Sequence, residues 1–377
     1  MRILMLNYDC PPLGAGAGQM ALGLSKALVR VGHHVDFVTM GFRRLPSHEV
    51  IEGVHVHRVA CLRRRAHLCT MFEAATYVFS ALAAVRRLAR QHRYDVVHAH
   101  FIFPGGLVAW LAARWTGVPY LITAHGSDVP DYNPYRLKFA HQLLKPLWRA
   151  VVRGAAIVIC PSRRLRGLVG QAGATVPVEI IPNGLDVPSE AKGRVEGRLR
   201  RILIVGRMVQ LKGVQHVLAA LNGSSKDYEL HVVGDGPYLS TLRQLAEPYG
   251  TRVKFWGWLD GRSAQFKELF ETSSLFILPS ESENFPVVLL EAMAAGLPII
   301  TTTGTGCDEV VGNAAILVPP TDVPALRQAM KLLVENEPLR RKMGEAGRRR
   351  LEEQFSWPVV ARRYVDVYHL PMVRPLE

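Results

Sequence analysis

Two carboxylates, Glu283 and Glu291, lie eight positions apart in a segment with the features of an anion-binding site. An apolar run at 275–278 predicts a strand before them, and the residues after Pro286 predict the start of a helix. The first turn of a helix presents backbone N–H groups and the positive end of the helix dipole, which suit a phosphate. A carboxylate one turn into the helix instead accepts hydrogen bonds from hydroxyls. The pattern favours a ligand with both groups, such as a nucleotide sugar.

A purely structural interpretation is also open, because acidic residues in a first helical turn stabilise the helix dipole. The segment resembles the Glu-x7-Glu motif of retaining glycosyltransferases with two Rossmann-like domains, including glycosyltransferase family 4. Its continuation to Pro298 is also similar. The resemblance implies that Glu283 contacts hydroxyls of the donor sugar and that Glu291 contacts the ribose.

The loop between the two glutamates departs from the commonest form of this motif. Asn284 and Pro286 stand where glycines are frequent in the family. A proline has no N–H to donate. We therefore expect backbone contacts to the donor from Asn284, Phe285, Val287 or Val288.

Two cations, Arg207 and Lys212, lie between Gly206 and Gly213, directly after a predicted strand at 201–205. A guanidinium can hold a diphosphate in a bidentate way and an ammonium adds a point charge, so both can stabilise a nucleoside diphosphate leaving group. Taken alone, the pair is better explained as two ordinary surface cations on a loop. The segment resembles the Gly-Arg-x4-Lys-Gly pattern of the same family, which implies contact with the donor diphosphate. We find no Asp-x-Asp arrangement between strands, so we expect neither a metal ion nor another cofactor.

A glycine-rich loop with Gly14, Gly16 and Gly18 follows the first predicted strand. The spacing is a weak match to a dinucleotide-binding fingerprint, and no acidic residue ends the second strand to hold a ribose. The loop resembles the family's glycine loop after Pro-Pro, although Ala15-Gly16 stands where two glycines are usual. The resemblance implies that this loop borders the donor phosphate and the acceptor.

Three histidines end predicted strands of the N-terminal half. His125 can donate to a sugar hydroxyl, although a single histidine is often structural; it resembles the family's His-Gly-x-Asp histidine, which lies against the donor sugar. His98 and His100 form a His-x-His pair that can bind metal on a strand. No third ligand is evident, so we favour a role without metal. In the C-terminal half, Gly234 and Trp258 follow two strands where the family binds ribose and base.

The sequence predicts strands at 2–6, 34–39, 54–59, 95–98, 120–123 and 156–159, and again at 201–205, 229–233, 253–255, 275–278, 298–301 and 315–318. Helices alternate with these strands in both halves, which predicts an α/β protein with parallel, doubly wound sheets. The resemblance implies two Rossmann-like domains facing a cleft, the GT-B architecture. We expect an N-terminal acceptor-side domain at 1–186, a polar linker at 187–198 and a nucleotide-sugar-binding domain at 199–355. A C-terminal helix at 356–377 is expected to cross back to the first domain.

Length and composition limit the number of domains and the cellular compartment that we expect for the protein. A chain of 377 residues with 49% hydrophobic content is long enough for two cores. No signal peptide or membrane-spanning stretch is evident. Five scattered cysteines without a Cys-x-x-Cys pair indicate reduced thiols, and we expect a cytoplasmic protein.

The net charge of +14 lies mainly in the N-terminal half, where residues 1–190 hold 22 basic and 11 acidic side chains. Residues 136–153 interleave basic and apolar residues on what would be an amphipathic helix interrupted at Pro146, and Arg63–Arg65 and Arg86–Arg87 add charge. This pattern can lie on an anionic membrane at the inner face of the plasma membrane. A core-packing helix with a solvated basic face explains it nearly as well. No nucleic-acid-binding motif is present, and we expect no such partner.

Taken together, the motifs predict a retaining glycosyltransferase that moves a sugar from a UDP- or GDP-sugar to a hydroxyl of a glycan or lipid-linked acceptor in bacterial surface polysaccharide or glycolipid synthesis. A sugar-nucleotide epimerase, or a membrane scaffold that binds nucleotide sugars without catalysis, are the alternatives. The predicted catalytic residues are Glu283, His125, Arg207 and Lys212. The predicted donor-binding residues are Gly14, Gly16, Gly18, Gly206, Gly234, Trp258, Asn284, Phe285, Val287 and Glu291.

Overall fold

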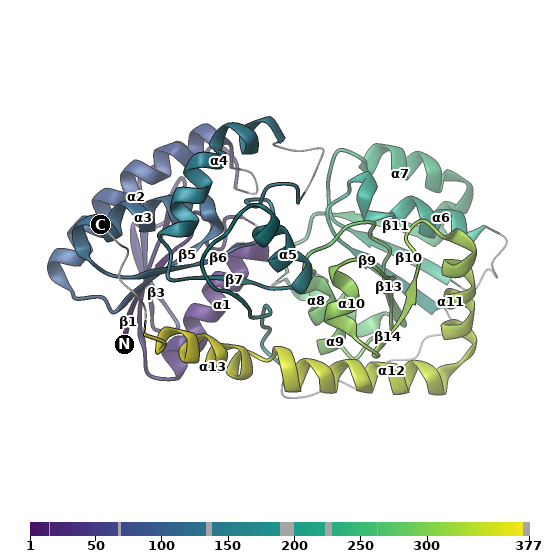
Figure 1. Cartoon of the computed structure of the whole chain (residues 1–377). Coiled ribbons are helices and arrows are strands. Elements are labelled where there is room, and N and C mark those ends of the chain that lie inside the picture. The colour runs from purple at the N-terminus through teal and green to yellow at the C-terminus, as the bar shows by residue number, and fades with distance from the viewer. Residues whose placement is uncertain are drawn as a thin grey trace. The chain divides into compact units, whose positions relative to one another are not determined.

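The chain forms two compact α/β units in a computed structural model. The first unit comprises Met1–Gly184 and Trp357–Glu377, and the second comprises Leu185–Ser356. The structure describes residues 1–14, 16–66, 69–132, 138–188, 200–222, 228–261 and 263–371. Most of the linker expected at 187–198 lies outside these residues. In both units, helices flank a central sheet (Figure 1).

The first unit has an eight-stranded sheet in the order β3-β4-β2-β1-β5-β6-β7-β8. All of its pairs are parallel except β3 with β4, which is antiparallel. The strands are β1 (Arg2–Leu6), β2 (His34–Met40), β3 (His48–Ile51), β4 (Val54–Val59), β5 (Val96–His100), β6 (Tyr120–Thr123), β7 (Ile157–Cys160) and β8 (Val178–Ile180). The two edge strands, β3 and β8, were not predicted, because they are short and lack a continuous apolar run.

Helices cover both faces of this sheet. They are α1 (Gly16–Arg30), α2 (Met71–Gln91), α3 (Leu107–Thr116), α4 (Lys138–Arg153), α5 (Arg163–Gln171) and α13 (Trp357–Tyr368), with a short turn η1 (Phe101–Gly106) after β5. The predicted interruption at Pro146 is wrong, since α4 continues through it. Packing overrides the lost backbone hydrogen bond, because Trp148, Val151 and Val152 of α4 are fully buried in the core.

The second unit has a six-stranded, fully parallel sheet in the order β11-β10-β9-β12-β13-β14. The strands are β9 (Arg200–Val205), β10 (Tyr228–Val233), β11 (Val253–Gly257), β12 (Leu275–Leu278), β13 (Ile299–Thr302) and β14 (Ala315–Val318). The helices are α6 (Val214–Leu221), α7 (Leu239–Ala246), α8 (Ala264–Thr272), α9 (Val287–Ala294), α10 (Gly306–Val311), α11 (Val323–Glu335) and α12 (Glu337–Arg350), and the short turns are η2 (Gln210–Lys212), η3 (Glu247–Arg252) and η4 (Leu351–Phe355). Apolar cores fill both faces of the sheet.

Both sheets have one topological switch point, where the strand order reverses. It lies between β1 and β5 in the first unit and between β9 and β12 in the second. Ligands of open α/β sheets bind outside the carboxyl ends of the strands at such a point. The predicted fold class is thereby confirmed, and the switch points locate where function should be sought.

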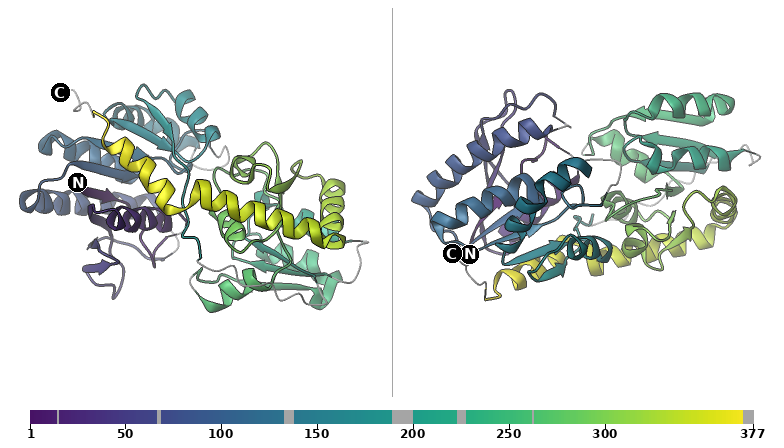
Figure 2. Two further views of the ribbon diagram at one scale, coloured as in Figure 1. Left: turned by 90° about the horizontal axis from the view of Figure 1, so that it is seen from below. Right: turned by 45° about the horizontal axis from the view of Figure 1, so that its top comes forward.

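The C-terminal helix α13 packs on the first unit beside α1 (Figure 2). A methyl group on Gly23 would lie 2.4 Å from the ring of Trp357, and one on Gly184 would lie 2.5 Å from it. Further along α13, the Tyr368 hydroxyl lies 2.7 Å from His98 Nδ1 and the Tyr364 hydroxyl lies 3.3 Å from Thr123 Oγ1. The last helix thus contributes both packing and hydrogen bonds to β5 and β6. No helix in the described part of the chain is long and apolar enough to cross a membrane.

Because Trp357 is 4% exposed, its removal should leave a cavity between α13 and α1. We expect Trp357→Ala to lower the free energy of unfolding of the first unit by about 3–5 kcal/mol in a urea titration. Trp115→Ala, at a 46% exposed position on α3, is the control and should cost about 1 kcal/mol or less. Equal costs for the two variants would contradict the docking of α13.

Candidate functional site

The loops after β9 and β12 meet at the switch point of the second unit. Lys212 Nζ donates a hydrogen bond to Glu283 Oε1, so two predicted catalytic residues form an ion pair. Their side chains are 25% and 9% exposed, respectively. The Glu281 N–H donates to the Leu211 carbonyl at 2.8 Å and links the two loops again. The sequence predicted both residues for one site, and the structure brings them into contact.

Glycines allow the loops at this edge to approach one another closely. Gly213 has φ +72°, and a Cβ there would lie 2.1 Å from the Pro279 carbonyl oxygen. Gly234 has φ +132°, and a Cβ there would lie 1.8 Å from the Gly206 carbonyl oxygen. Left-handed backbone and such approaches both require glycine. Gly234, predicted to contact the donor, therefore has a structural role in joining the loops after β9 and β10. A Cβ on Gly206, also predicted to contact the donor, would meet only Lys212 Cδ, at 4.0 Å.

Helix α9 begins at this edge without a side-chain cap. Pro286 is its N-cap residue and accepts no hydrogen bond through its side chain, and the first turn holds no acidic residue. The N–H groups of the first turn of a helix lack intrahelical partners, and Val287 and Val288 are half-buried there. Phe285 is 8% exposed and packs against Phe355 with ring centroids 5.6 Å apart, so its side chain belongs to the core.

Glu291 is the fifth residue of α9 and is half-buried. Burial raises the pKa of its carboxyl to about 7. Burial removes water from this carboxyl, and no cation compensates for the loss by lowering its pKa. The carboxyl can regain hydrogen bonds from the hydroxyls of a ligand, as the sequence comparison with the family implied for a ribose.

Arg207 and Trp258 are exposed at the same edge of the sheet. Arg207 follows β9, and Trp258 follows β11 and is 68% exposed. The strand end beside Trp258 is fixed, because the Gly234 N–H donates to the Gly257 carbonyl at 2.7 Å. A cation after β9 and an aromatic ring after β11, with β10 between these strands, thus lie at the same edge of the sheet as the ion pair.

The glycine loop of the first unit packs around Asp9. A Cβ on Gly14, which has φ +81°, would lie 2.3 Å from the Asp9 carboxyl carbon, and one on Gly18 would lie 3.1 Å from Asp9 Cβ. Gly16 has no atom within 4 Å of its Cβ position and begins α1. Gly14 and Gly18 therefore serve close packing, whereas the space beside Gly16 is open to a ligand.

Arg63 forms a buried ion pair with Asp9, at 2.6 Å. The sequence placed Arg63 on the basic surface, which is wrong, because its side chain is 1% exposed. Burial raises the pKa of Asp9, and the Arg63 guanidinium opposes that rise. No sequence signal separates Arg63 from its exposed neighbours Arg64 and Arg65.

The strand-end histidines of the first unit form a neutral cluster. His98 hydrogen-bonds to the Tyr368 hydroxyl at 2.7 Å and to Thr123 Oγ1 at 2.8 Å, so both of its ring nitrogens have partners. His100 Nδ1 lies 3.0 Å from His125 Nε2. Burial lowers the pKa of His98 and of His125 to about 3, and it holds the pKa of His100 well below its usual value. In the described part of the chain, no group of three or more His, Cys, Asp or Glu side chains is placed to hold a metal ion.

Asp128 holds the loops after β5 and β6 together, and the site residues predicted from the sequence do not include it. It is 7% exposed and accepts hydrogen bonds from the N–H groups of Ile102, His125 and Gly126 at 2.7, 3.1 and 2.9 Å. Asp128 thereby fixes the backbone that carries His125. The signal was in the sequence, as the aspartate of the His-Gly-x-Asp element.

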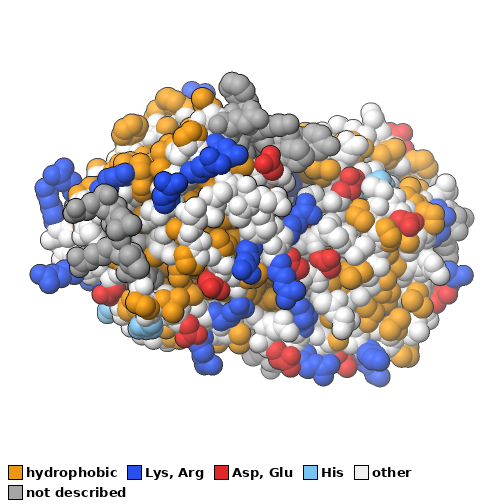
Figure 3. All heavy atoms as spheres, in the orientation of Figure 1, with side chains coloured by type: hydrophobic (Ala, Val, Ile, Leu, Met, Phe, Trp, Pro, Cys, Tyr) orange, Lys and Arg blue, Asp and Glu red, His pale blue; other side chains and the backbone are white. Residues whose placement is uncertain are grey.

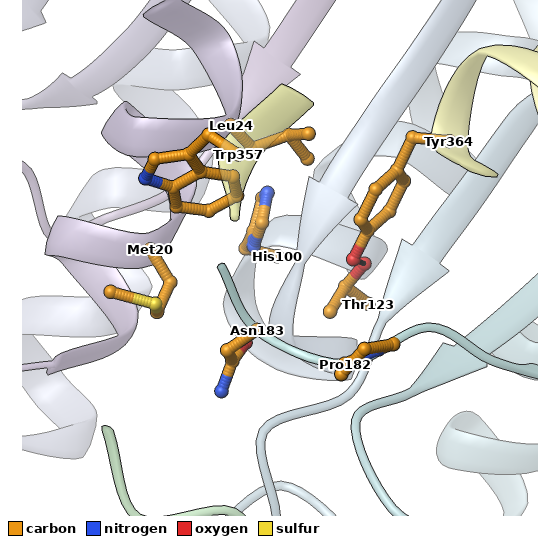
Figure 4. Close-up of a pocket in the computed structure, with 8 residues that line it drawn as sticks. All are labelled: Met20, Leu24, His100, Thr123, Pro182, Asn183, Trp357 and Tyr364. Atoms are coloured by element: carbon orange, nitrogen blue, oxygen red, sulfur yellow. Dashed lines mark hydrogen bonds between the residues drawn. The ribbon is translucent and has the colours of Figure 1, made fainter. Parts of the chain in front are cut away.

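A small cavity in the first unit lies beside His100 (Figure 4). Side chains from α1, the strand ends β5 and β6, α13 and the segment after β8 converge on it. They belong to Met20, Leu24, His100, Thr123, Pro182, Asn183, Trp357 and Tyr364.

Comparison with known families accounts for nearly the whole chain. Residues 14–188 match the sequence model of Glycosyltransferase Family 4, and residues 189–350 match that of Glycosyl transferases group 1. The chain belongs to glycosyltransferase family 4. It is a transferase enzyme with the GT-B fold of two Rossmann-like domains.

Curated relatives of this glycosyltransferase match it along nearly their full length. The N-acetyl-alpha-D-glucosaminyl L-malate synthase of Bacillus anthracis is 26% identical, over 97% of this chain and 97% of the relative. The glycogen synthase of Mycobacterium tuberculosis is 28% identical, over 98% of this chain and 94% of the relative. The family thus includes members named for different acceptors.

Solved structures share the fold of this glycosyltransferase. The sucrose-phosphate synthase of Thermosynechococcus elongatus superposes with a TM-score of 0.82 at 22% identity, covering 97% of this chain and 98% of that one. The Anabaena protein HepE, solved in complex with UDP-glucose, superposes with a TM-score of 0.74 at 17% identity, covering 97% and 99%.

The raised pKa of Glu291 predicts how the stability of this glycosyltransferase depends on pH. Below pH 4.5 the carboxyl is protonated in both the folded and the unfolded chain, and above about 7 it is ionised in both. The burial penalty on the folded chain therefore grows as the pH rises between these values. We expect Glu291→Gln to be more stable than the wild type by about 1–3 kcal/mol above pH 7 and to match it near pH 4.5. Urea titrations at the two pH values measure this, and a pH-independent difference would contradict the assignment.

Proposed function

We propose that this glycosyltransferase transfers a sugar from a UDP- or GDP-sugar to an acceptor hydroxyl with retention of configuration. One observation carries the proposal: the contact of Lys212 with Glu283 at the switch point between β9 and β12. It brings a phosphate-binding cation and a hydroxyl-binding carboxylate to one place. The likeness to HepE, whose structure holds UDP-glucose, supports a nucleotide sugar as donor.

The electrostatics of the second unit suit a diphosphate. Arg207 supplies a bidentate donor, Lys212 supplies a point charge, and the first turn of α9 supplies the N–H groups of Val287 and Val288. Before the donor arrives, the Glu283 carboxylate partly neutralises Lys212. Binding gives the ammonium a second anion and leaves Glu283 to accept hydrogen bonds from the sugar. Trp258 offers an exposed ring on which the base can stack, and Glu291 accepts from the ribose hydroxyls.

The reaction is proposed to occur on one face of the sugar. The bond from the anomeric carbon to the leaving phosphate oxygen breaks, and a bond to the acceptor oxygen forms on the same side. The proton of the acceptor hydroxyl moves to the leaving phosphate oxygen. Arg207, Lys212 and the start of α9 stabilise the charge that develops on the nucleoside diphosphate, so we propose that no metal ion is required. His125 of the first unit donates a hydrogen bond to the donor sugar.

Substitution of Glu283 separates transfer from mere binding. We expect Glu283→Gln and Arg207→Ala to lower kcat/KM by about 100- to 1,000-fold, because each removes an interaction with the donor in the transition state. Glu281→Gln, on the same loop, is the control and should retain activity. Release of UDP or GDP from a panel of nucleotide sugars, with and without a chelator, is the measurement.

Three outcomes of this assay would count against the proposal. Unchanged transfer by Glu283→Gln would contradict the assigned site. Interconversion of two nucleotide sugars without nucleotide release would support an epimerase. Nucleotide binding without turnover by the wild type on any acceptor tested would support the non-catalytic scaffold.

We further propose that the first unit docks on an anionic membrane through α2 rather than through the predicted segment 136–153. Part of that segment lies outside the described residues, and the apolar residues Trp148, Val151 and Val152 of α4 are buried. On α2, by contrast, Phe72 and Phe79 are 68% and 76% exposed. Figure 3 has hydrophobic side chains gathered at the upper left, over α2, with basic side chains beside them.

The apolar surface on α2 extends to its neighbours along the chain. Met71 is 58% exposed, and Leu62 is 60% exposed, with its N–H bonded to Thr76 Oγ1 of α2 at 3.2 Å. We call Leu62, Met71, Phe72 and Phe79 the α2 patch. Isolated exposed apolar residues are ordinary on a surface, but three in the first half of α2, with Leu62 held beside Thr76, mark an interaction site.

The charges around the α2 patch are basic. Residues 61–94 hold seven arginines and one acidic residue, Glu73. Glu73 is 4% exposed and accepts hydrogen bonds from the N–H groups of Thr70 and Arg64, so it presents little charge to the surface. The exposed arginines are Arg64, Arg65, Arg86, Arg87, Arg90 and Arg93. They complement anionic headgroups while the apolar side chains enter the interface. A lipid-linked or polysaccharide acceptor at the inner face of the plasma membrane fits this arrangement.

Vesicle binding tests the α2 patch. We expect Phe72→Ser/Phe79→Ser to weaken co-sedimentation with phosphatidylcholine–phosphatidylglycerol vesicles about tenfold or more, because two inserted side chains are lost. The matched control is Leu245→Ser/Leu332→Ser, at two 46% exposed positions of the second unit. Arg86→Glu/Arg87→Glu should weaken binding most at low salt. Equal binding to vesicles without phosphatidylglycerol, or a dimer in solution that the Phe72→Ser/Phe79→Ser variant dissociates, would contradict the proposal.

A further inference from the structure

Three histidine rings lie in a row at the carboxyl ends of β5 and β6. The ring centroids of His98 and His100 are 4.6 Å apart, and those of His100 and His125 are 5.2 Å apart, with both pairs stacked. All three are neutral near neutral pH, because burial lowers their pKa values. Each ring therefore carries one proton, on one of its two nitrogens.

One proton lies between His100 and His125. His100 Nδ1 and His125 Nε2 are 3.0 Å apart, so one of the two nitrogens donates and the other accepts. The proton therefore belongs either to His100 Nδ1 or to His125 Nε2. The position of this proton decides which nitrogen of His125 is protonated. It therefore decides whether the other nitrogen of His125, Nδ1, donates a hydrogen bond to a ligand or accepts one.

The other nitrogen of His100 decides between the two arrangements. His100 is 1% exposed, and its Nε2 has no hydrogen-bond partner among the residues that the structure describes. If His125 donated, His100 would carry its own proton on Nε2, as a buried N–H without an acceptor. If His100 donates through Nδ1, its Nε2 is only an unprotonated lone pair. A buried donor without a partner is the rarer and more costly of these two states.

We propose that His100 is a positioning residue that donates through Nδ1 to His125 Nε2 and so confines the proton of His125 to Nδ1. His125 then acts as a neutral N–H donor through Nδ1, with its Nε2 occupied. That His125 contacts a hydroxyl of the donor sugar rests on the proposed function. The assignment of the tautomer of His125 does not depend on that function.

The cavity beside His100 is compatible with this assignment. Asn183 and Thr123 lie among its lining residues (Figure 4). A water molecule held there can donate to the lone pair of His100 Nε2, which leaves the proton of His100 on Nδ1. A water that instead accepted from Nε2 would reverse both tautomers, and this is the outcome that a direct measurement has to exclude.

Nitrogen-15 NMR of the ligand-free protein labelled at histidine reports the tautomers directly. His125→Gln and His100→Gln assign the two rings by the signals that each removes. We expect His125 to show a protonated Nδ1 and an unprotonated Nε2, and His100 to show the same. A protonated Nε2 on either ring would overturn the proposal. Because no substrate is present, the result is independent of whether the proposed transfer reaction is correct.

Kinetics then test whether His100 acts through His125. An asparagine places its amide nitrogen near the position of Nδ1, whereas glutamine places it near Nε2, and leucine offers no donor. We expect His100→Leu and His100→Gln to lower kcat about 10- to 100-fold and His100→Asn to restore much of the loss. In a His125→Ala background, His100→Leu should have no further effect.

Two results would contradict a positioning role for His100. Equal activities of the asparagine and glutamine variants would show that a donor at the Nδ1 position is immaterial. A full additional loss in the His125→Ala background would show that His100 acts independently of His125. If the leucine variant fails to fold, the asparagine and glutamine pair still decides the question.

Discussion

The ion pair between Lys212 and Glu283 depends on the order of the strands in the second unit. β9 and β12 are adjacent, and the connections that follow them approach at the switch point of the sheet. Gly213 allows that approach, because any side chain there would collide with the Pro279 carbonyl. A cation and a carboxylate that are 71 residues apart in sequence thus become one charged pair. The start of α9, Arg207 and Trp258 lie at the same carboxyl edge of this parallel sheet.

The first unit brings its functional groups together with little charge. Its histidines are buried and neutral, Asp128 is saturated by three backbone N–H groups, and Asp9 is paired with Arg63. Two tyrosines of α13 hydrogen-bond to His98 of β5 and Thr123 of β6. The polar groups at this strand edge are therefore held by internal hydrogen bonds and ion pairs rather than exposed as free charges.

The sequence predicted the fold closely where patterns are local. All twelve predicted strands are present, with ends that agree to within two residues. The sequence also assigned Lys212 and Glu283 to one site, because each follows a predicted strand of the second unit. The contact of His98 with Tyr368 joins residues 270 apart and has no local signal. The burial of Arg63 and the exposure of Phe72 and Phe79 were likewise invisible, since composition alone does not say which side of a helix or loop packs on the core. The sequence likewise did not predict that α4 continues through Pro146, because the packing that holds the helix together there has no local signal.

Hydrogen–deuterium exchange of the wild-type protein with and without UDP or GDP tests the central claim most directly. If the nucleoside diphosphate binds at the switch point of the second unit, peptides covering residues 206–213 and 283–291 gain protection at saturating nucleotide. Protection confined to the first unit, or none with either nucleotide, would contradict the account.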